Sequence, residues 1–338
     1  MAEHQIINPY ERLQIVHNSD DTLTRLNHLP TTAATDDTAD QKSHTLVLSK
    51  DIPLNIVNKT WVRIFRPPSH TSSVKLPLMV YFHGGGFILR SAASTIYHDF
   101  CSNMAIQLPA LIVSVEHRLA PESRLPAAYE DAIEALHWVR KHASQSVVNG
   151  EDDWLSRDSV DFSRCYLMGS SSGANIAFHA RLRALTMFSD AADEPLKIIG
   201  LIMHHPFFGG FQRTESEMRL FNNPRFSMSV SDLMWDLALP VGSDRDHGYC
   251  NPLKVGESCH GIGLLGRCLV TTCGGDPLID RQTEFVKMLE GEGVNVLAQF
   301  DEEGYHLVEL YEPDKAQALL VIIKDFIFQL QAQSEESS

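Results

Sequence analysis

The sequence predicts an α/β fold in which a mostly parallel central sheet is flanked by helices. Short apolar runs of strand length alternate with longer segments of helical periodicity over most of the chain, as a doubly wound sheet requires. Two of these runs lead directly into glycine-containing loops, at the ends of strands where such sheets place their chemistry. The 338 residues, of which 43% are hydrophobic, are enough for one large domain with a cap.

The individual elements are assigned in chain order from their periodicity. Segments 45–49 and 59–65 alternate apolar and polar residues, which predicts antiparallel edge strands. The buried strands are expected at 76–82, 111–115, 165–168, 198–203, 267–272 and 294–300. The helices are expected at 97–106, 129–142, 174–180 and 316–329.

The alternation breaks between residues 209 and 266, where aromatic and polar residues gather. This break predicts a helical cap inserted after the sixth strand, although a long helical insertion packed on the sheet fits the same pattern. Residues 1–45 predict an irregular N-terminal arm, and 46–208 and 267–330 form the two parts of the core. The polar tail at 331–338 is expected to be disordered.

Ser171 is the predicted nucleophile because of the setting of its pentapeptide, Gly-Ser-Ser-Ser-Gly at 169–173. An expected strand ends just before the pentapeptide and an expected helix begins just after it. A Gly-x-Ser-x-Gly motif in that setting forms a sharp strand-to-helix turn that exposes the serine hydroxyl. The flanking glycines leave room for the turn, and the first N–H groups of the helix point towards the site.

A second glycine-rich loop, His-Gly-Gly-Gly-Phe at 83–87, follows the first buried strand. Backbone N–H groups in such a loop can stabilise the oxyanion that develops during acyl transfer. We expect the oxyanion hole to involve Gly84, Gly85 and Gly86, together with the N–H of Ser172. A phosphate-binding loop is excluded because no Gly-Lys-Ser/Thr follows, and a plain glycine-rich turn is the remaining alternative.

Asp276 and His306 complete a predicted Ser-His-Asp triad, in the chain order that α/β hydrolases use. Asp276 ends the expected strand at 267–272, whereas its competitor Asp280 fits better as an acidic residue in the first turn of a helix. His306 follows the next expected strand. It is distinguished from the other histidines of the chain by its order and setting, not by its residue type.

Together these motifs resemble the plant carboxylesterases of the hormone-sensitive-lipase-like branch of the α/β hydrolases. The similarity extends from about Asn8 to about Gln329. Besides the loop at 83–87, its markers are the blocks 117–122 (His-Arg-Leu-Ala-Pro-Glu), 125–131 (Leu-Pro-Ala-Ala-Tyr-Glu-Asp), 244–247 (Asp-Arg-Asp-His), 249–252 (Tyr-Cys-Asn-Pro) and 275–280 (Gly-Asp-Pro-Leu-Ile-Asp). The resemblance implies ester hydrolysis through an acyl-enzyme without a cofactor, and a lid to which the N-terminal arm contributes.

Two positions at the elbow depart from the usual family pattern. Ser170 stands where the family commonly has Asp or Glu, and Ser172 stands where it commonly has Ala. Because position 172 donates through its backbone, we expect the second change to be tolerated. The Ser-Ser-Gly-Ala stretch also resembles the elbow of a plant alkaloid acetylesterase, which implies a short-chain, acetyl-like ester of a specialised metabolite as substrate.

The substrate pocket is expected to be lined by bulky aromatic residues. They are Phe87, Phe207, Phe208 and Trp235. Bulky Phe and Met side chains in a cap favour a short acyl group.

Two other functions on the same scaffold remain as alternatives. A hormone-type small-molecule receptor of this family carries an aliphatic residue in place of the catalytic histidine, and the presence of His306 argues against it. A non-hydrolytic enzyme, such as an acyltransferase, dehydratase or cyclase, stays open because an intact triad can pass an acyl group to another alcohol when water is kept out.

The composition restricts the partners. A formal net charge of −15 argues against nucleic acid and against anionic membrane surfaces. The six cysteines form no Cys-x-x-Cys pair and fit no standard metal spacing, so we expect no metal and no cofactor. With no visible signal peptide, the simplest prediction is a cytoplasmic monomer or homodimer that acts on a small-molecule ester.

Overall fold

The computed structural model describes residues 8–35, 47–67, 75–144, 153–188, 194–254 and 261–335. Its main sheet is built from β3 (Leu48–Asn55), β4 (Thr60–Arg66), β5 (Leu76–Phe82), β6 (Leu111–Glu116), β7 (Val160–Ser170), β8 (Ile198–His204), β9 (Arg267–Cys273) and β10 (Val296–Asp301). The helices of the described residues are α1 (Pro9–Leu13), α2 (Thr95–Gln107), α3 (Ala127–Ser144), α4 (Ser172–Met187), α5 (Glu215–Arg219), α6 (Met228–Ala238), α7 (Ile279–Gly291) and α8 (Pro313–Glu335).

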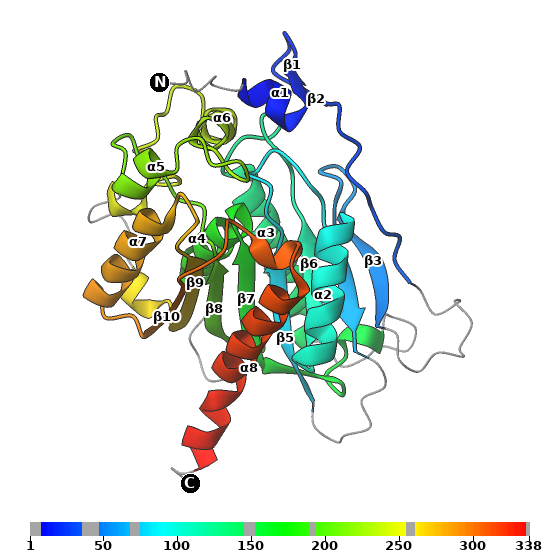
Figure 1. Cartoon of the computed structure of the whole chain (residues 1–338). Coiled ribbons are helices and arrows are strands. Elements are labelled where there is room, and N and C mark those ends of the chain that lie inside the picture. Colours follow the sequence, from blue (N-terminus) through cyan, green and yellow to red (C-terminus); the bar gives the residue numbers. More distant parts are fainter. Residues whose placement is uncertain are drawn as a thin grey trace.

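The sheet has the strand order β10-β9-β8-β7-β5-β6-β4-β3 (Figure 1). All strands from β10 to β6 pair in parallel, whereas β4 and β3 are antiparallel and form one edge. The mostly parallel α/β fold is therefore confirmed. Antiparallel strands do form this end of the sheet, but the strand expected at 45–49 begins at Leu48 and continues to Asn55, and residues 45 and 46 lie outside the described residues. The strand expected at 59–65 is β4, which pairs on both sides and is therefore second from the edge. Because the parallel strands end at the same edge, the loops that follow β5, β7, β8, β9 and β10 meet there.

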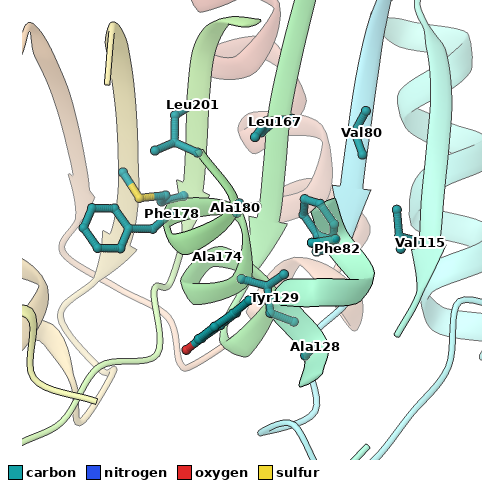
Figure 2. Packing of buried hydrophobic residues seen from close by; sticks show 14 of the residues in the cluster. Val80, Phe82, Val115, Ala128, Tyr129, Leu167, Ala174, Phe178, Ala180 and Leu201 are labelled. Carbon is teal, nitrogen blue, oxygen red and sulfur yellow. The ribbon is translucent and has the colours of Figure 1, made fainter. Parts of the chain in front are cut away.

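Two hydrophobic cores lie on opposite faces of the sheet, since successive side chains of a strand point to opposite sides. Val80 and Phe82 of β5 belong to the core shared with α3, α4 and α7. Met79 and Tyr81 belong to the core covered by α2 and α8. Figure 2 shows the first face, where Val80 and Phe82 lie near the helix that carries Phe178. The sheet is thereby buried on both sides, which keeps the carboxyl edge of its strands in a fixed geometry.

The C-terminal helix is longer than the sequence predicted. It was expected at 316–329, but α8 begins at Pro313 and continues to Glu335. The prediction of a disordered tail is therefore wrong for residues 331–335, and 336–338 lie outside the described residues. Proline is well tolerated in the first turn of a helix, which explains the earlier start. No helix in the described ranges has the length and apolar character needed to cross a bilayer.

The described part of the N-terminal arm is more regular than predicted. It contains α1 and an antiparallel hairpin of β1 (Ile15–His17) and β2 (Leu23–Arg25). These elements lie with α6 at one end of the molecule (top of Figure 1), and α1 packs against α6. The arm and part of the 209–266 interval are thus neighbours, although the proposed boundaries between core and cap remain a prediction.

Arg25 fastens this arm to the core. Its Nε donates to the carbonyl oxygen of Ile88 (2.8 Å), directly after the 83–87 loop, and Nη2 donates to that of Ala120 (3.0 Å). Its guanidinium also binds Glu122 through both carboxylate oxygens, at 2.8 and 2.9 Å. Glu122 accepts a further hydrogen bond from the N–H of Leu23 (2.9 Å). Although partial burial favours the neutral acid, Arg25 and this N–H lower the pKa of Glu122 to about 2.

Arg124 makes a second connection, between arm, core and α6. Its Nη1 donates to the carbonyl oxygens of Asp236 (2.7 Å) and Leu239 (3.0 Å), at the C-terminal end of α6. Its Nη2 lies 3.3 Å from the carboxylate of Asp21 in the β1–β2 turn. A cation at the carbonyl end of a helix satisfies acceptors that the helix leaves free. Arg124 therefore fixes where α6 ends and where the hairpin sits on it.

Replacing Arg25 with alanine should release the arm without unfolding the sheet. We expect the free energy of unfolding to fall by about 1–2 kcal/mol, since the lost bonds involve charged but partly exposed groups. Hydrogen exchange at 15–25 should accelerate strongly while exchange in β5 and β7 stays slow. Arg157→Ala, which removes an exposed arginine elsewhere, is the matched control. Unchanged exchange at 15–25 in Arg25→Ala would show that the arm is held by other contacts.

Glu122 makes the docking of the arm dependent on pH. A depressed pKa means that the stabilisation is complete above the ordinary value of 4.5 and is lost as pH falls towards about 2. We expect exchange at 15–25 in the wild type to rise across this window relative to the rest of the chain. In the variant Glu122→Gln, exchange at 15–25 relative to the rest of the chain should not change over the same pH range.

Candidate active site

Ser171 lies on a strained turn between β7 and α4. Its φ of 56° and ψ of −120° place it in a region that residues with a β-carbon rarely occupy. A β-carbon at Gly169 would overlap the backbone of Gly173, and one at Gly173 would overlap the carbonyl of Phe82. The N–H of Ser171 donates to the carbonyl oxygen of His204 at the end of β8 (2.9 Å). The two glycines and this bond hold the serine in the turn that the motif predicts.

The structure brings Ser171, His306 and Asp276 together from three separate loops. Nε2 of His306 lies 2.9 Å from Oγ of Ser171, and its Nδ1 lies 2.7 Å from Oδ2 of Asp276. The three residues are 4%, 8% and 0% exposed, respectively. Because an ionised carboxylate can only accept, Nδ1 of His306 carries the hydrogen and Nε2 faces the serine hydroxyl as an acceptor. This arrangement can remove a proton from the serine.

Asp276 is held as a carboxylate although it is fully buried. Burial favours its neutral form, but the electrostatic interaction with His306 and the hydrogen bonds from His205 and His306 lower its pKa well below the usual range. Oδ1 also accepts the N–H of Leu278 (2.9 Å), and Oδ2 accepts Nε2 of Gln282 (3.1 Å). The surroundings of Asp276 therefore favour its ionised form.

His205 is a member of this group that sequence reasoning missed. Its Nδ1 lies 2.6 Å from Oδ2 of Asp276, the same oxygen that binds His306. Burial and the neighbouring His204 lower the pKa of His205 to about 4. The sequence feature that could have identified His205 is its position directly after an expected buried strand. Asp280, the alternative acid, lies in the first turn of α7 and accepts the N–H of Ser216 (2.7 Å).

The backbone of the loop after β5 runs beside the serine. A β-carbon at Gly84 would lie 3.2 Å from Cβ of Ser171, so the two backbones are close. Gly85 (φ 124°) and Gly86 (φ 61°) have positive φ values that favour glycine. Among the described residues, no backbone hydrogen bond uses the N–H of Gly85 or Gly86. These groups are available to an anionic oxygen beside the serine, as is the N–H of Ser172 at the start of α4.

Aromatic rings cover the imidazole. Phe226 stacks on His306, with ring centroids 4.6 Å apart and an angle of 18°. Phe207 lies 6.0 Å from Phe226 and stacks on Trp235 at 4.6 Å. Phe87, directly after the glycines, lies 5.4 Å from Trp235. Three of the four residues expected to line the pocket therefore belong to one continuous aromatic wall, and Phe226 is an additional member that the sequence did not single out as a pocket residue.

Phe208 is a core residue and not part of this wall. Its ring contacts Phe178 of α4 at 5.8 Å and Phe285 of α7 at 4.5 Å. Consecutive side chains of an extended segment point in opposite directions, so Phe207 and Phe208 cannot both face the site. The prediction that Phe208 lines the pocket is therefore wrong.

The turn that carries Phe226 is fastened at three points. Asn223 donates to the carbonyl oxygen of Gly275, next to Asp276, at 3.3 Å. The guanidinium of Arg225 lies 4.6 Å above the ring of Tyr305. From the N-terminal arm, Arg12 donates to the carbonyl oxygen of Pro224. Both the core and the arm thus hold the ring of Phe226 over the imidazole.

Two clusters of the described residues contain metal-ligand types. They are His205, Asp276 and His306, and His204, His205 and Glu309. In the first cluster both imidazoles donate a hydrogen bond to the carboxylate. Hydrogen atoms therefore lie where a metal ion would have to bind. In the second, Nε2 of His204 lies 2.7 Å from Glu309. The first cluster therefore provides no open coordination for a metal, and the absence of a metal remains a prediction.

Comparison with known proteins assigns the family. Residues 79–310 match the family model described as the alpha/beta hydrolase fold. Two proteins of Papaver somniferum named 3-O-acetylpapaveroxine carboxylesterase are each 49% identical over 327 residues, which covers 94% of this chain and 99% and 97% of theirs. Carboxylesterase 20 of Arabidopsis thaliana is 44% identical over 333 residues (96% and 97%). A hyperthermophilic esterase from Pyrobaculum calidifontis has the same fold, with a TM-score of 0.66 and 24% identity over 84% of this chain and 86% of its own.

The fold and the match define an α/β hydrolase. Within this class, the chain belongs to the plant carboxylesterases of the hormone-sensitive-lipase-like branch, as its motifs predicted. It is an enzyme that hydrolyses carboxylic ester bonds.

Replacing Phe226 with alanine should expose His306. Because the stacked ring covers one face of the imidazole, we expect diethyl pyrocarbonate to modify His306 several-fold faster in this variant, as read by mass spectrometry of its peptide. Phe211→Ala, at a 58% exposed residue of the same interval, is the control and should leave the rate unchanged. Equal rates in the two variants would mean that the ring of Phe226 does not protect the histidine.

Proposed function

We propose that this carboxylesterase cleaves small esters through an acyl-enzyme formed on Ser171. The observation that supports the proposal most directly is the hydrogen-bonded series from Ser171 through His306 to Asp276, at 2.9 and 2.7 Å. Oγ of Ser171 attacks the ester carbonyl carbon while Nε2 of His306 takes its proton. Asp276 orients the ring through Nδ1 and stabilises the imidazolium that forms.

The oxyanion of the tetrahedral intermediate is bound by backbone N–H groups. We assign the donors to Gly85, Gly86 and Ser172, while Gly84 lets the loop approach the serine. The positive φ values of Gly85 and Gly86, and the N–H groups of all three residues that no backbone hydrogen bond within the described residues uses, support this assignment. Each preorganised donor of this kind accelerates acyl transfer by roughly 10²–10³-fold.

The second half of the reaction reuses the same imidazole. His306 gives its proton to the leaving alcohol oxygen, and the ester C–O bond breaks to leave the acyl group on Ser171. A water molecule then attacks the acyl carbon while His306 takes one of its protons. Collapse of the second intermediate returns that proton to Oγ of Ser171 and releases the carboxylic acid. Every step uses groups of this chain and water, so no cofactor takes part.

The site is proposed to accept only short acyl groups, because bulky side chains pack against the oxyanion loop. A β-carbon at Gly86 would overlap Sδ of Met234, so this thioether packs directly on the glycine. Phe87, Phe207 and Trp235 are fully buried around it. The space left beside the glycines suits an acetyl-like group better than a longer chain.

The alcohol part is proposed to be a plant specialised metabolite. The two poppy relatives are named for 3-O-acetylpapaveroxine, an acetylated compound, and they match nearly the whole of this chain. Among the alternatives, a receptor role is disfavoured because the series from Ser171 to Asp276 is intact. The expected cytoplasmic location and monomeric or homodimeric state stay predictions. The five described cysteines are free thiols, which agrees with a reducing compartment.

Replacing Ser171 with alanine should abolish the proposed chemistry. We expect kcat for p-nitrophenyl acetate to fall by at least about 10³-fold with an unchanged unfolding temperature. Ser170→Ala is the matched control, because Oγ of Ser170 binds the hydroxyl of Tyr81 on the other side of the strand (3.1 Å). Its activity should stay within a few-fold of wild type. An active Ser171→Ala enzyme would refute the assignment of the nucleophile.

Shortening Met234 should lengthen the acyl groups that the enzyme accepts. In Met234→Ala the ratio of kcat/KM for p-nitrophenyl butyrate to that for the acetate should rise about tenfold, since pocket volume discriminates between chains of different length on that scale. The exposed Met187→Ala provides the control. The ratio is measured within each variant, so a general loss of stability does not affect it. An unchanged ratio would mean that Met234 does not limit the acyl pocket.

A further inference from the structure

The carboxylate of Asp276 is shared between two histidines. Oδ2 lies 2.7 Å from Nδ1 of His306 and 2.6 Å from Nδ1 of His205, and the two rings are nearly perpendicular with centroids 5.3 Å apart. The catalytic steps proposed above need only one of these imidazoles. His205 is nevertheless buried to the same degree as the acid itself.

The backbone holds His205 in a strained conformation that aims its ring at Asp276. Its φ of 46° is uncommon for a residue with a β-carbon, and its N–H donates to the carbonyl oxygen of Thr271 (2.8 Å). Strain of this kind persists only where the surroundings enforce it, and it occurs preferentially at functional sites. The preceding residue, His204, accepts the N–H of Ser171 through its carbonyl oxygen. One dipeptide therefore connects the backbone of the nucleophile with the side chain of the acid.

Burial and the neighbouring histidines favour the neutral form of His205, whereas Asp276 favours the charged form. Four titratable groups surround its ring. They are Asp276 and His306 on one side, and His204 with Glu309 on the other. Burial, and secondly His204, lower the pKa of His205 to about 4, so above that pH its Nδ1 carries one hydrogen and the ring carries no charge. Burial opposes the charge on Glu309, but His204 lowers the pKa of this carboxyl. Nε2 of His204 lies 2.7 Å from Oε2 of Glu309, and this contact holds the ring of His204 next to His205.

A neutral donor on Oδ2 weakens the attraction of Asp276 for the proton of its other partner. We propose that His205 is a positioning residue: its Nδ1–H orients the Asp276 carboxylate and sets the pH at which His306 becomes free to act as a base. This inference rests on the proposed triad. Without the donor, the carboxylate holds a positive imidazolium at His306 more strongly, so the acid limb of the pH profile of kcat/KM moves to higher pH.

Three substitutions at one position separate this role from simple packing. His205→Leu removes the donor. His205→Asn keeps an amide nitrogen near the place of Nδ1, and His205→Gln moves the amide nitrogen one bond farther out. We expect the acid limb of kcat/KM for p-nitrophenyl acetate to rise by about half to one pH unit in the Leu and Gln variants, and to stay at the wild-type position in Asn. The rate at the optimum should fall roughly tenfold where the limb moves.

A buried histidine away from the site provides the control. His179 of α4 is buried, stacks on Tyr129 at 4.5 Å, and has its pKa lowered by burial to about 3. His179→Leu should lower the unfolding temperature and leave the acid limb in place. A limb that moves in His179→Leu as far as in His205→Leu would assign the shift to general destabilisation and overturn the inference.

The Asn and Gln pair decides the question even where His205→Leu does not fold. A shifted limb in Gln with a wild-type limb in Asn supports the inference, and any other combination overturns it. Failure of the proposed triad has a different signature, because Ser171→Ala would then hydrolyse the ester as fast as wild type. An inactive Ser171→Ala enzyme together with identical limbs in all His205 variants would reject the role of His205 alone.

Discussion

The buried charge of Asp276 is the constraint around which the carboxyl edge of the sheet is organised. An isolated carboxylate in a protein interior is strongly unfavourable, so it must be paired and fully hydrogen-bonded. Four donors meet this need, and they come from the end of β8, the loop after β10, and the beginning and first turns of α7. Each of these segments is therefore held at a defined distance from the others. We infer that the geometry of the proposed catalytic series results from satisfying this single charge.

The nucleophile depends on the same edge through its backbone. Ser171 occupies a turn with a positive φ, and its N–H is bonded to the carbonyl of His204, next to the residue that supports Asp276. Gly173 packs against the carbonyl of Phe82, so β5 and the start of α4 approach as closely as glycine allows. The loop that follows β5 is thereby brought beside the serine hydroxyl with its N–H groups unused. The strained backbone of Ser171 and the unused N–H groups of the 83–87 loop have the same cause. Both result from the close contact of the neighbouring strands β5, β7 and β8.

Above this rigid edge, the arm and the 209–266 interval decide what can reach the serine. Phe226 covers His306, and Met234 and Trp235 reach the site from α6. Arg25 and Arg124 bind these segments to one another and to the loops after β5 and β6. The contacts are mostly between side chains of distant segments, so small changes in the sequence can alter them without disturbing the sheet. We infer that the sheet and its loops carry the reacting groups, whereas the arm and the 209–266 interval determine which substrates are accepted.

The alternation of apolar runs determined the fold class, because a strand buried on both faces must be apolar throughout, and local glycines determined where the chain turns sharply. Ser171, Asp276 and His306 could be predicted for the same reason: each follows a strand, and parallel strands end together. The regular hairpin of the arm was not predicted, since it depends on packing against distant residues, and the extension of α8 to Glu335 was not predicted either. Only the tertiary structure places His205 beside Asp276 and Phe226 over His306. It also decides the different directions of Phe207 and Phe208. These features depend on contacts between side chains of loops that are tens of residues apart in the sequence. A local sequence pattern contains no information about such contacts.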